Sequence, residues 1–339
     1  MPRSINIAPG RARASDVARA AGVSVSAVSR TFTGGSVSAH VRERVLAAAR
    51  ELTYRPNAMA AALHTRRTNV VAILMTTRTN SHFPEVLSEL SHAADKYERR
   101  VMLFTVDDAD AVPKAVNQIL AYQVDAVLSL TEVPIEDARM LESHGVSLVL
   151  YNRASAPYPS TLVSCDHRAA GRTLGRHLLA LGHRHFGVAQ GPLFSGLAND
   201  RRDGVFDALA EAGVSRQAVG LAVGDFSYDS GRAAARDLLK GRTRPTAIVA
   251  INDMMAIGVI DEAATLGLSP PTELSVASFD GVQAAKWARY RLTTMAQPLP
   301  QLADAALEAI VRLTEAPDRA RETRLLSCHL MRGESAVAI

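Results

Sequence analysis

The apolar residues near the start of the chain recur at helical spacing, which predicts two short helices joined by a tight turn. Val17, Ala20 and Ala21 share one face of the first helix. Gly22 stands where that helix must end and the backbone must turn. Val28 points from the second helix toward the interior. The pattern is typical of a helix-turn-helix, whose second helix fits the major groove of DNA; a helical hairpin inside a core is the alternative.

Three serines are placed to cap helices in this region. Ser15 is predicted to cap the first helix, with Asp16 well placed at its positive end. Ser24 is predicted to cap the second helix. Ser38 is predicted to cap a third helix, whose apolar positions are Val41, Val45, Ala48 and Leu52. The first 55 residues therefore predict a three-helix head.

The outer face of the second helix carries small side chains and hydrogen-bond donors, namely Val25, Ser26, Ser29 and Arg30. Arginine suits a bidentate contact with guanine, and valine suits contact with a thymine methyl group. We therefore predict that Arg30, Ser26 and Val25 face base edges. Ser15 and Ser29 complete the predicted DNA-binding set of the head.

Beyond residue 69, buried-type apolar runs alternate with amphipathic helical segments. The predicted strands are Val70–Met75, Val101–Val106, Ala126–Leu130, Val146–Leu150, Phe186–Gln190, Ala247–Ile251 and Leu274–Phe279. The predicted helices are Glu85–Arg99, Val112–Tyr122, Arg168–Leu181, Arg202–Ala212, Ser230–Leu239 and Met255–Leu266. Such alternation indicates parallel sheets flanked by helices, and this length suits two doubly wound lobes better than one.

Charge is divided unevenly between these two regions. Residues 1–68 contain eleven arginines, no lysine and three acidic residues, which gives a net charge of +8. The whole chain carries +4, so residues 69–339 carry −4. A basic head on a mildly acidic body is the distribution expected of a module that neutralises phosphates.

Composition narrows the class of protein further. A hydrophobic content of 47% over 339 residues supplies ample core and excludes a disordered chain. No stretch approaches the roughly 18 apolar residues of a membrane span. Residues 1–14 contain no apolar run and are predicted to be a basic, disordered arm rather than a signal peptide. Cys165 and Cys328 are far apart in sequence and are expected to be free thiols in a cytoplasmic protein.

Side chains that suit a small polar ligand follow the predicted strands. Ligands in doubly wound folds bind at the carboxyl ends of strands. The predicted strand-end and loop residues are His82, Phe83, Asn152, Arg153, Asn252 and Asp280, with Phe226 in a loop and Arg201 at the start of a helix. Each has an alternative: the phenylalanines as core residues, and Arg153 and Arg201 in surface salt bridges. Asp166 and Asp253 are equally well placed to cap the helices that follow them.

Several pieces of the sequence occur in the order and at the spacing of a known family. In the head they are Asp16-Val17-Ala18, Ala21-Gly22-Val23-Ser24, Val28-Ser29-Arg30, Arg42-Glu43-Arg44-Val45, Tyr54-Arg55-Pro56-Asn57 and the Leu63 that ends an alanine run. In the body they are Gly182-His183-Arg184, Arg201 with Gly204, Asn252-Asp253, Phe279-Asp280-Gly281 and Gln297-Pro298. On these residues, nearly the whole chain resembles the lactose-repressor (LacI/GalR) family of bacterial transcription regulators.

The resemblance implies an α/β fold class, with an N-terminal all-helical head and a two-lobed, periplasmic-binding-protein-like effector body. It implies a homodimeric, ligand-responsive regulator, most often a repressor, that binds a near-palindromic operator and is cytoplasmic, or nucleoid-associated when bound. The residues that would line or border the effector site are His82, Phe83, Asn152, Arg153, Arg201, Phe226, Asn252 and Asp280. Arg153 and Arg201 suit a carboxylate, whereas Asp280 and Asn252 suit sugar hydroxyls. The identity of the effector therefore stays open between a sugar, a sugar acid and a related metabolite. The choice between inducer and corepressor stays open as well.

The segment from Pro56 to Leu63 is predicted to be a hinge. Proline suits the first turn of a helix, and the alanines that follow favour helix, but eight residues are too few for a stable isolated one. We therefore expect it to be helical only on operator DNA. There the resemblance implies that Asn57 belongs to the DNA-binding set and that Leu63 wedges between base steps in the minor groove. A plain linker is the alternative.

One departure from the family pattern concerns the end of the third helix. Thr53 stands where the family usually has a helix-ending glycine before Tyr54. The helix must therefore end without a residue that easily takes the left-handed conformation.

Enzyme classes fit the sequence poorly. It contains no Gly-x-Gly-x-x-Gly after the first predicted strand, no P-loop, no Gly-x-Ser-x-Gly and no His-Glu-x-x-His. His183 and His185 have no nearby third ligand, so we expect them to be structural, and no metal or cofactor is predicted. The alternatives to a DNA-binding regulator are a secreted two-lobed sugar-binding protein and, less favoured, an NAD-type α/β enzyme.

The predicted organisation assigns each stretch of the chain to a part. It places a basic arm at 1–14, the head at 15–55, the hinge and linker at 56–68, a first lobe at about 69–164 and 294–324, and a second lobe at about 165–293 and 325–339.

Overall fold

The computed structural model describes residues 12–55, 67–76, 82–154, 160–241, 244–316 and 320–339. The chain divides into two compact units, Met1–Thr68 and Asn69–Ile339, called here the head and the body. The predicted hinge, including Asn57 and Leu63, lies outside the described residues, as does the predicted arm apart from its last three residues.

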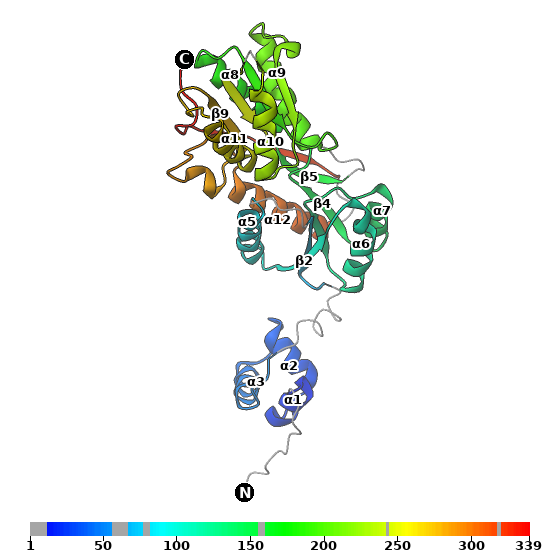
Figure 1. Cartoon of the computed structure of the whole chain (residues 1–339). Helices are drawn as coiled ribbons and strands as arrows, with labels where there is room; N and C mark the ends of the chain where they lie inside the picture. The colour runs from blue at the N-terminus through cyan, green and yellow to red at the C-terminus, as the bar shows by residue number, and fades with distance from the viewer. Residues whose placement is uncertain (1–11, 56–66, 77–81, 155–159, 242–243, 317–319) are drawn as a thin grey trace. The chain divides into compact units, whose positions relative to one another are not determined.

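The head contains three helices: α1 (Ala14–Ala21), α2 (Val25–Phe32) and α3 (Ala39–Glu51) (Figure 1). One fully buried valine from each helix, Val17, Val28 and Val45, forms the centre of its core. The predicted apolar face of α1 is wrong at one position, because Ala18 is buried and Ala20 is exposed. The core is small, and alanines fill most of the space between the helices.

The predicted helix ends are mostly confirmed. Gly22 ends α1 with a φ of 61°, and the hydroxyls of Ser24 and Ser38 accept hydrogen bonds from Ala27 N–H (3.2 Å) and Val41 N–H (3.3 Å). The prediction for Ser15 is wrong, since this residue lies exposed inside the first turn of α1. The Asp16 carboxylate already accepts the N–H of the cap residue, Arg13, at 2.9 Å, so the helix begins earlier.

The end of α3 places Thr53 in an unfavourable conformation. Tyr54 N–H donates to Ala49 O at 2.8 Å and Thr53 N–H donates to Arg50 O at 3.1 Å, which is the double hydrogen bond of a Schellman motif. The motif needs a left-handed residue, and Thr53 supplies it with a φ of 48°. The chain therefore adopts the family geometry with a β-branched residue, which strains this position.

The body contains two six-stranded sheets. The first has the order β11-β5-β4-β3-β1-β2 and the second the order β12-β10-β9-β8-β6-β7. All paired strands are parallel except β10 and β12. The strands of the first sheet are β1 (Val70–Thr76), β2 (Arg100–Val106), β3 (Ala126–Ser129), β4 (Ser147–Tyr151), β5 (Thr161–Cys165) and β11 (Thr323–Leu326). Those of the second are β6 (Phe186–Gln190), β7 (Gly220–Val223), β8 (Ala247–Ala250), β9 (Ser275–Asp280), β10 (Thr293–Ala296) and β12 (His329–Met331).

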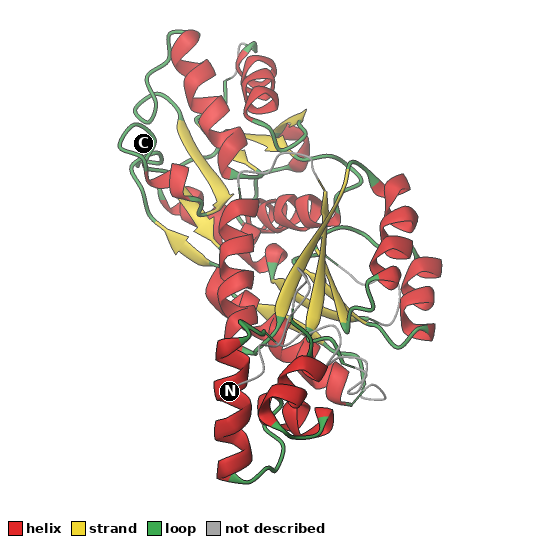
Figure 2. Ribbon diagram, turned by 90° about the horizontal axis from the view of Figure 1, so that it is seen from below, coloured by secondary structure: helices red, strands yellow, loops and turns green. Residues whose placement is uncertain are grey.

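Helices cover both faces of the first sheet, and together they form the first lobe (Figures 1 and 2). On one face α5 (Phe83–Lys96) packs against α12 (Leu299–Glu315), and on the other lie α6 (Val112–Ala121) and α7 (Ile135–Ser143). The buried strands β1, β3, β4 and β5 have side chains in the two cores on either side of the sheet. This arrangement is the doubly wound fold that the alternating pattern predicted.

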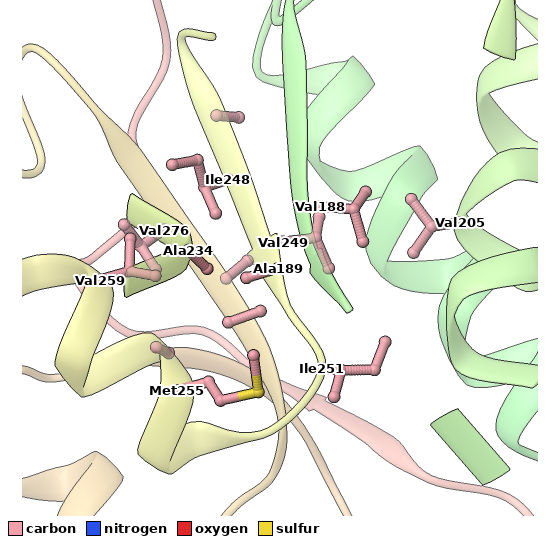
Figure 3. Close-up of a cluster of buried hydrophobic side chains, with 14 of the residues drawn as sticks. Val188, Ala189, Val205, Ala234, Ile248, Val249, Ile251, Met255, Val259 and Val276 are labelled. Carbon is pink, nitrogen blue, oxygen red and sulfur yellow. The ribbon is translucent and has the colours of Figure 1, made fainter. Parts of the chain in front are cut away.

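The second lobe pairs its helices closely. Its core contains the central strands and includes Val188, Ile248 and Val249 (Figure 3). Here α8 (His167–Ala180) packs against α9 (Gly196–Glu211), and α10 (Tyr228–Leu239) packs against α11 (Asp253–Thr265). A Cβ on Gly171 would lie 2.1 Å from Arg201 O, and one on Gly204 would lie 2.0 Å from Arg168 O. Glycine is therefore required for the close approach of α8 and α9.

The predicted strands and helices are present, with ends shifted by a few residues. The exception is the predicted helix Arg202–Ala212, because α9 begins at Gly196, where Ser195 caps it by accepting from Ala198 N–H at 3.4 Å. Arg201 therefore lies inside α9 and not at its start. The predicted lobe boundary at 294 also falls inside β10, which pairs with β9 of the second sheet. The pattern did not predict the strands β5, β7, β10, β11 and β12 or the helices α7 and α12.

The chain crosses between the lobes at three places. They are the connections from β5 to α8, from β10 to α12 and from β11 to β12. Within the described residues, no helix has the length and apolar character needed to span a membrane.

Candidate functional site

The outer face of α2 carries the predicted base-reading residues. Val25, Ser26, Ser29 and Arg30 are all exposed, and Val25 is 50% exposed. Arg30 Nε donates to Ser26 O at 3.3 Å, which lays the side chain along the helix with its charged end in solvent. The helix thus presents an apolar group, hydroxyls and a guanidinium side by side, while Val28 is buried beneath them.

Two other arginines of the head hold its turns together. Arg44 donates to the carbonyls of Ala21 and Gly22, at the turn between α1 and α2. Arg42 donates to Thr31 O at 3.1 Å and to Gly35 O at 3.5 Å, after α2. Their guanidinium groups satisfy carbonyls left open at helix ends. These arginines therefore set the position of α2 as well as adding positive charge.

A cavity of about 440 Å³ lies in the body, at the carboxyl ends of strands from both sheets. All eight residues predicted for the effector site line it: His82, Phe83, Asn152, Arg153, Arg201, Phe226, Asn252 and Asp280. Its volume is that of a site for a small molecule. That these eight residues contact an effector stays a prediction.

The floor of this cavity belongs to a closed ring of hydrogen bonds between five side chains, of which all but His167 line the cavity. Arg201 Nη2 donates to Asp280 Oδ1 at 2.7 Å, and Gln297 Nε2 donates to the same oxygen at 2.8 Å. Asn152 Nδ2 donates to Gln297 Oε1 at 2.8 Å. His167 Nε2 lies 2.9 Å from Asn152 Oδ1, and Arg201 Nε donates to His167 Nδ1 at 3.3 Å. The ring joins the end of β4 in the first sheet to α9 and β9 in the second lobe.

His167 closes the ring in a single protonation state. Its Nδ1 accepts from Arg201, so the ring proton is on Nε2, which donates to Asn152. Burial holds the pKa of His167 well below its usual range, and the charge of Arg201 lowers it further. The imidazole is therefore neutral, and it accepts on one side of the ring and donates on the other.

Arg201 and Asp280 form the charged centre of the ring. Their side chains are 3% and 5% exposed, and Arg201 Nη1 also donates to Ile251 O at 2.8 Å. The guanidinium lies over the Phe279 ring, 5.1 Å from its centroid. Arg201 is placed here because α8 and α9 meet at glycines, which brings the start of α8 to its side chain. The predicted surface salt bridge is thus a buried one.

Asn252 has a structural task beside its place in the cavity wall. It is the cap residue of α11: its Oδ1 accepts from Met255 N–H at 2.9 Å, and its Nδ2 donates to Phe226 O at 2.9 Å. Phe226 takes a φ of 73°, which this hydrogen bond helps to hold.

Asp253 is not the cap of α11: it is fully buried and accepts from Ser278, Thr294 and the backbone N–H groups of Gly281 and Val282. Asp166 does cap α8, at 2.8 Å from Ala169 N.

The cavity wall is rich in negative charge. It contains six carboxylates, from Asp107, Asp108, Asp110, Glu132, Asp225 and Asp280, and two guanidinium groups. Both arginines face carboxylates of the wall, because Arg153 Nη2 lies 3.1 Å from Glu132 Oε1 and Arg201 is paired with Asp280. Among the described lining residues, carboxylates therefore outnumber guanidinium groups.

Sequence reasoning missed His167 and did not assign Gln297 to the site. Gln297 is part of Gln297-Pro298, one of the sequence pieces on which the family resemblance rests, so the sequence did carry a signal for this residue. His167 lies between the predicted cap Asp166 and the predicted helix Arg168–Leu181, but β5 before it is not predicted, so His167 does not stand out as a residue near a strand end. His183 is buried and bonded to Thr246 Oγ1 (2.9 Å) and Val337 O (3.1 Å), which supports its structural role. The described residues hold no cluster of three or more side chains suited to a metal ion.

Comparisons with known proteins agree with this geometry. Residues 15–57 match a model of bacterial regulatory proteins of the lacI family, and residues 175–336 match a model of a periplasmic binding protein-like domain. The chain is 30% identical over 293 residues to the HTH-type transcriptional regulator DegA of Bacillus subtilis, covering 85% of this chain and 87% of that protein. It is 32% identical over 311 residues to the repressor PurR of Yersinia enterocolitica, covering 89% and 91%.

Solved structures extend the likeness to the whole chain. A lac repressor dimer bound to operator and the anti-inducer ONPF superposes with a TM-score of 0.86 at 26% identity, covering 97% of this chain and 100% of that one. A complex of the transcriptional regulator CelR with cellobiose gives a TM-score of 0.72 at 27% identity, covering 96% and 100%.

Proposed function

Because this chain belongs to the lacI family and is a DNA-binding transcription regulator with an effector-binding body, we propose that it is a dimeric repressor whose effector is a small, uncharged, polyhydroxylated molecule. The observation that carries the effector class is the charge of the cavity wall. Both arginines among the described lining residues are already paired with carboxylates, and these residues hold six carboxylates against two guanidinium groups.

The wall charge disfavours a sugar acid. A ligand carboxylate would approach further acidic side chains, and to gain a salt bridge it would have to compete with Glu132 for Arg153 or with Asp280 for Arg201. Hydroxyl groups can both donate to the carboxylates and accept from amide or guanidinium N–H groups. Phe83 and Phe226 offer apolar faces for the carbon skeleton. The complex of CelR with cellobiose, an uncharged sugar, supports this choice.

The DNA contacts that we propose lie on α2. Arg30 would read a guanine, Val25 a thymine methyl group, and the hydroxyls of Ser26 and Ser29 neighbouring base edges or phosphates. Two heads of a homodimer would occupy two half-sites related by a two-fold axis. Residues 56–66 would connect each head to the first lobe, which starts with β1.

The effector would act through the hydrogen-bonded ring. A ligand on the cavity floor contacts side chains from both lobes and therefore favours one angle between them over others. Ring members would exchange partners with ligand hydroxyls, so that ligand binding and lobe angle are coupled. That angle would reach DNA through the segment between the lobe and the head.

Two measurements test this proposal. Selection of bound fragments from random DNA by the full-length protein should yield an inverted repeat. A set of DNA fragments without two-fold symmetry would contradict the binding of a dimer to two half-sites.

The effector class is tested with ligands that share one carbon skeleton. We would compare D-glucose, D-glucosamine and D-gluconate, and the corresponding series of a pentose, by the shift in melting temperature of the full-length protein. A ligand that binds only the folded state raises it by mass action. Stabilisation by an uncharged member is expected, whereas stabilisation by the acid alone would overturn the proposed class.

A further inference from the structure

The two cysteines of the chain lie side by side in the structure, although they are far apart in sequence. Cys165 is the last residue of β5, and Leu326 of β11 is its partner in the parallel ladder. Asp166 N–H continues the ladder by donating to Leu326 O at 2.9 Å. Cys328 follows two residues later, and its side chain packs against the core cluster that contains Cys165, so the two thiols lie near each other and each affects the pKa of the other. Both cysteines are free thiols.

This pair sits where the chain passes from one lobe to the other. Cys165 belongs to the core of the first lobe and begins the crossing from β5 to α8. Cys328 lies in the crossing from β11 to β12 and packs against the cores of both lobes. Two of the three crossings therefore bring their cysteines together at the edge of the same core. Neither thiol has a part in the function proposed above.

We propose that Cys165 and Cys328 are a redox modification site, at which a hydroperoxide oxidises the two thiols to a reversible disulfide across two lobe crossings. The chemistry requires two thiols in contact, one of them reachable from solvent. Cys165 is 3% exposed, whereas Cys328 is half-buried. Cys328 is therefore the thiol that the oxidant reaches, and Cys165 is the one that resolves the intermediate.

The electrostatics of the pair assign the same roles. The Cys165 thiol donates its hydrogen bond to Cys328, which lowers the pKa of Cys328, with the Arg201 guanidinium adding to the effect. The same hydrogen bond and burial raise the pKa of Cys165. A thiolate is the form that reacts with a peroxide. Cys328 therefore carries the nucleophilic sulfur.

The reaction balances with one hydroperoxide per chain. The Cys328 thiolate attacks an oxygen of hydrogen peroxide, the O–O bond breaks, and a sulfenic acid and hydroxide form. The Cys165 sulfur then attacks the sulfenic sulfur, and the thiol proton leaves with the hydroxyl as water. In total, two thiols are oxidised, one peroxide is reduced and two waters are released. A dithiol reverses the step by thiol–disulfide exchange.

The bond would restrict the movement of one lobe against the other. A covalent link between two crossings removes freedom from the segments that must deform when the lobe angle changes. The crossing that Cys165 begins leads into α8, whose first residue, His167, belongs to the hydrogen-bonded ring. An effect on DNA binding rests on the proposed function, whereas the disulfide itself does not.

The test uses the reduced full-length protein treated with hydrogen peroxide. We expect both of its thiols to be lost, a monomer on a non-reducing gel, one cross-linked peptide pair containing Cys165 and Cys328, and full recovery with dithiothreitol. Amide exchange in residues 326–330 should become slower in the oxidised protein and return to its former rate on reduction. Bonds between two chains, or sulfinic acid without a cross-link, would overturn the proposal. Unchanged exchange would overturn its mechanical part.

Single substitutions separate the two roles. In Cys165→Ser, peroxide should leave a sulfenic acid on Cys328 that dimedone traps. In Cys328→Ser, Cys165 should stay a thiol under the same treatment. Equal reactivity of the two remaining thiols would overturn the assignment. Cys165→Ala provides a second variant of the buried position, and fluorescence of Trp287 shows whether each variant is folded.

Discussion

The outer face of α2 in the head and the floor of the body's cavity use similar side chains in opposite ways. On α2, Val25, Ser26, Ser29 and Arg30 are exposed, and they contribute little to the core of the head. In the cavity, Arg201, Asp280 and their neighbours are buried and bonded to one another. The side chains on α2 are free of the core, whereas those on the cavity floor would have to exchange hydrogen bonds with one another for hydrogen bonds to a ligand.

Because of this difference, the side chains proposed to bind DNA contribute little to the stability of the head. The side chains proposed to bind the effector also stabilise the body. An exposed side chain can be changed at little cost to the fold. A buried charged group cannot, because its partner is left without compensation in a medium that solvates charge poorly. A ligand that engages the cavity floor therefore acts on the same interactions that hold the two lobes together.

The largest expected effect comes from breaking the buried ion pair. Arg201→Met or Asp280→Asn should each destabilise the body by about 3–5 kcal/mol, because each leaves one buried group unpaired. The double substitution should cost clearly less than the sum of the two. Urea unfolding followed by the fluorescence of Trp287, the single tryptophan, reports on the body alone.

The exposed pair Lys240 and Asp237 supplies the matched control for that measurement. Their side chains are 71% and 63% exposed, so Asp237→Asn should change the unfolding free energy by less than about 1 kcal/mol. Strictly additive effects of the two buried substitutions would show that Arg201 and Asp280 do not act as a pair.

Substitutions on the outer face of α2 should change the affinity for DNA and leave the stability of the head unchanged. Arg30→Ala should weaken binding to the selected operator by about 1–3 kcal/mol and relax selectivity at one position of each half-site. The measurement is a titration of operator and random DNA at fixed salt. Equal weakening on both would make Arg30 a phosphate contact instead.

Arg50 is a close control for Arg30. It is also exposed on a helix of the head, and its Nε donates to the carbonyl four residues earlier at 3.3 Å, as the Nε of Arg30 does. Arg50→Ala removes the same charge from a different helix. It should leave the ratio of operator to random DNA affinity unchanged.

The pH dependence of the body should depend on His167. The pKa of His167 is lowered in the folded state, so below about pH 6.5 the unfolded chain binds a proton that the folded chain does not. Stability should therefore fall with acidification below that pH, with a contribution from this group of up to about 1.4 kcal/mol per pH unit.

His167→Gln should reduce that slope while keeping the ring. The glutamine amide can accept from Arg201 and donate to Asn152, as the neutral imidazole does, but it does not titrate. His185→Gln changes an exposed histidine of the same lobe and serves as the control. An unchanged slope in His167→Gln would assign the acid sensitivity to other groups.

The smallest expected effect lies at the end of α3. Thr53→Gly should stabilise the head by about 1 kcal/mol, because glycine takes the left-handed conformation without the strain of a β-branched residue. Amide exchange of Ala48 to Leu52 should slow accordingly. Thr53→Ala keeps a Cβ in the same conformation and should give little change; equal slowing in both variants would remove strain as the cause.

Local patterns in the sequence predicted the three helices of the head and seven of the twelve described strands of the body, but not the helices α7 and α12. Helical spacing, cap serines and Gly22 identified α1, α2 and α3, since these signals act within a few residues of each other. The misplaced cap at Ser15 shows the limit, because Asp16 provides an equally local alternative. The strands β10, β11 and β12 escaped because short segments near lobe crossings carry too few residues for a periodic pattern.

The sequence by itself determined the three-helix head, the alternating body, the charge division and eight of the side chains that line the cavity. Only the tertiary structure decided how those side chains are used. Burial turned Arg201 and Asp280 into a pair, made His167 the neutral link between them and Asn152, and brought Cys165 to Cys328. Partners in these contacts are separated by 15 to 163 residues along the chain. No local pattern encodes such contacts, because they arise where α8 meets α9 and where β5 aligns with β11.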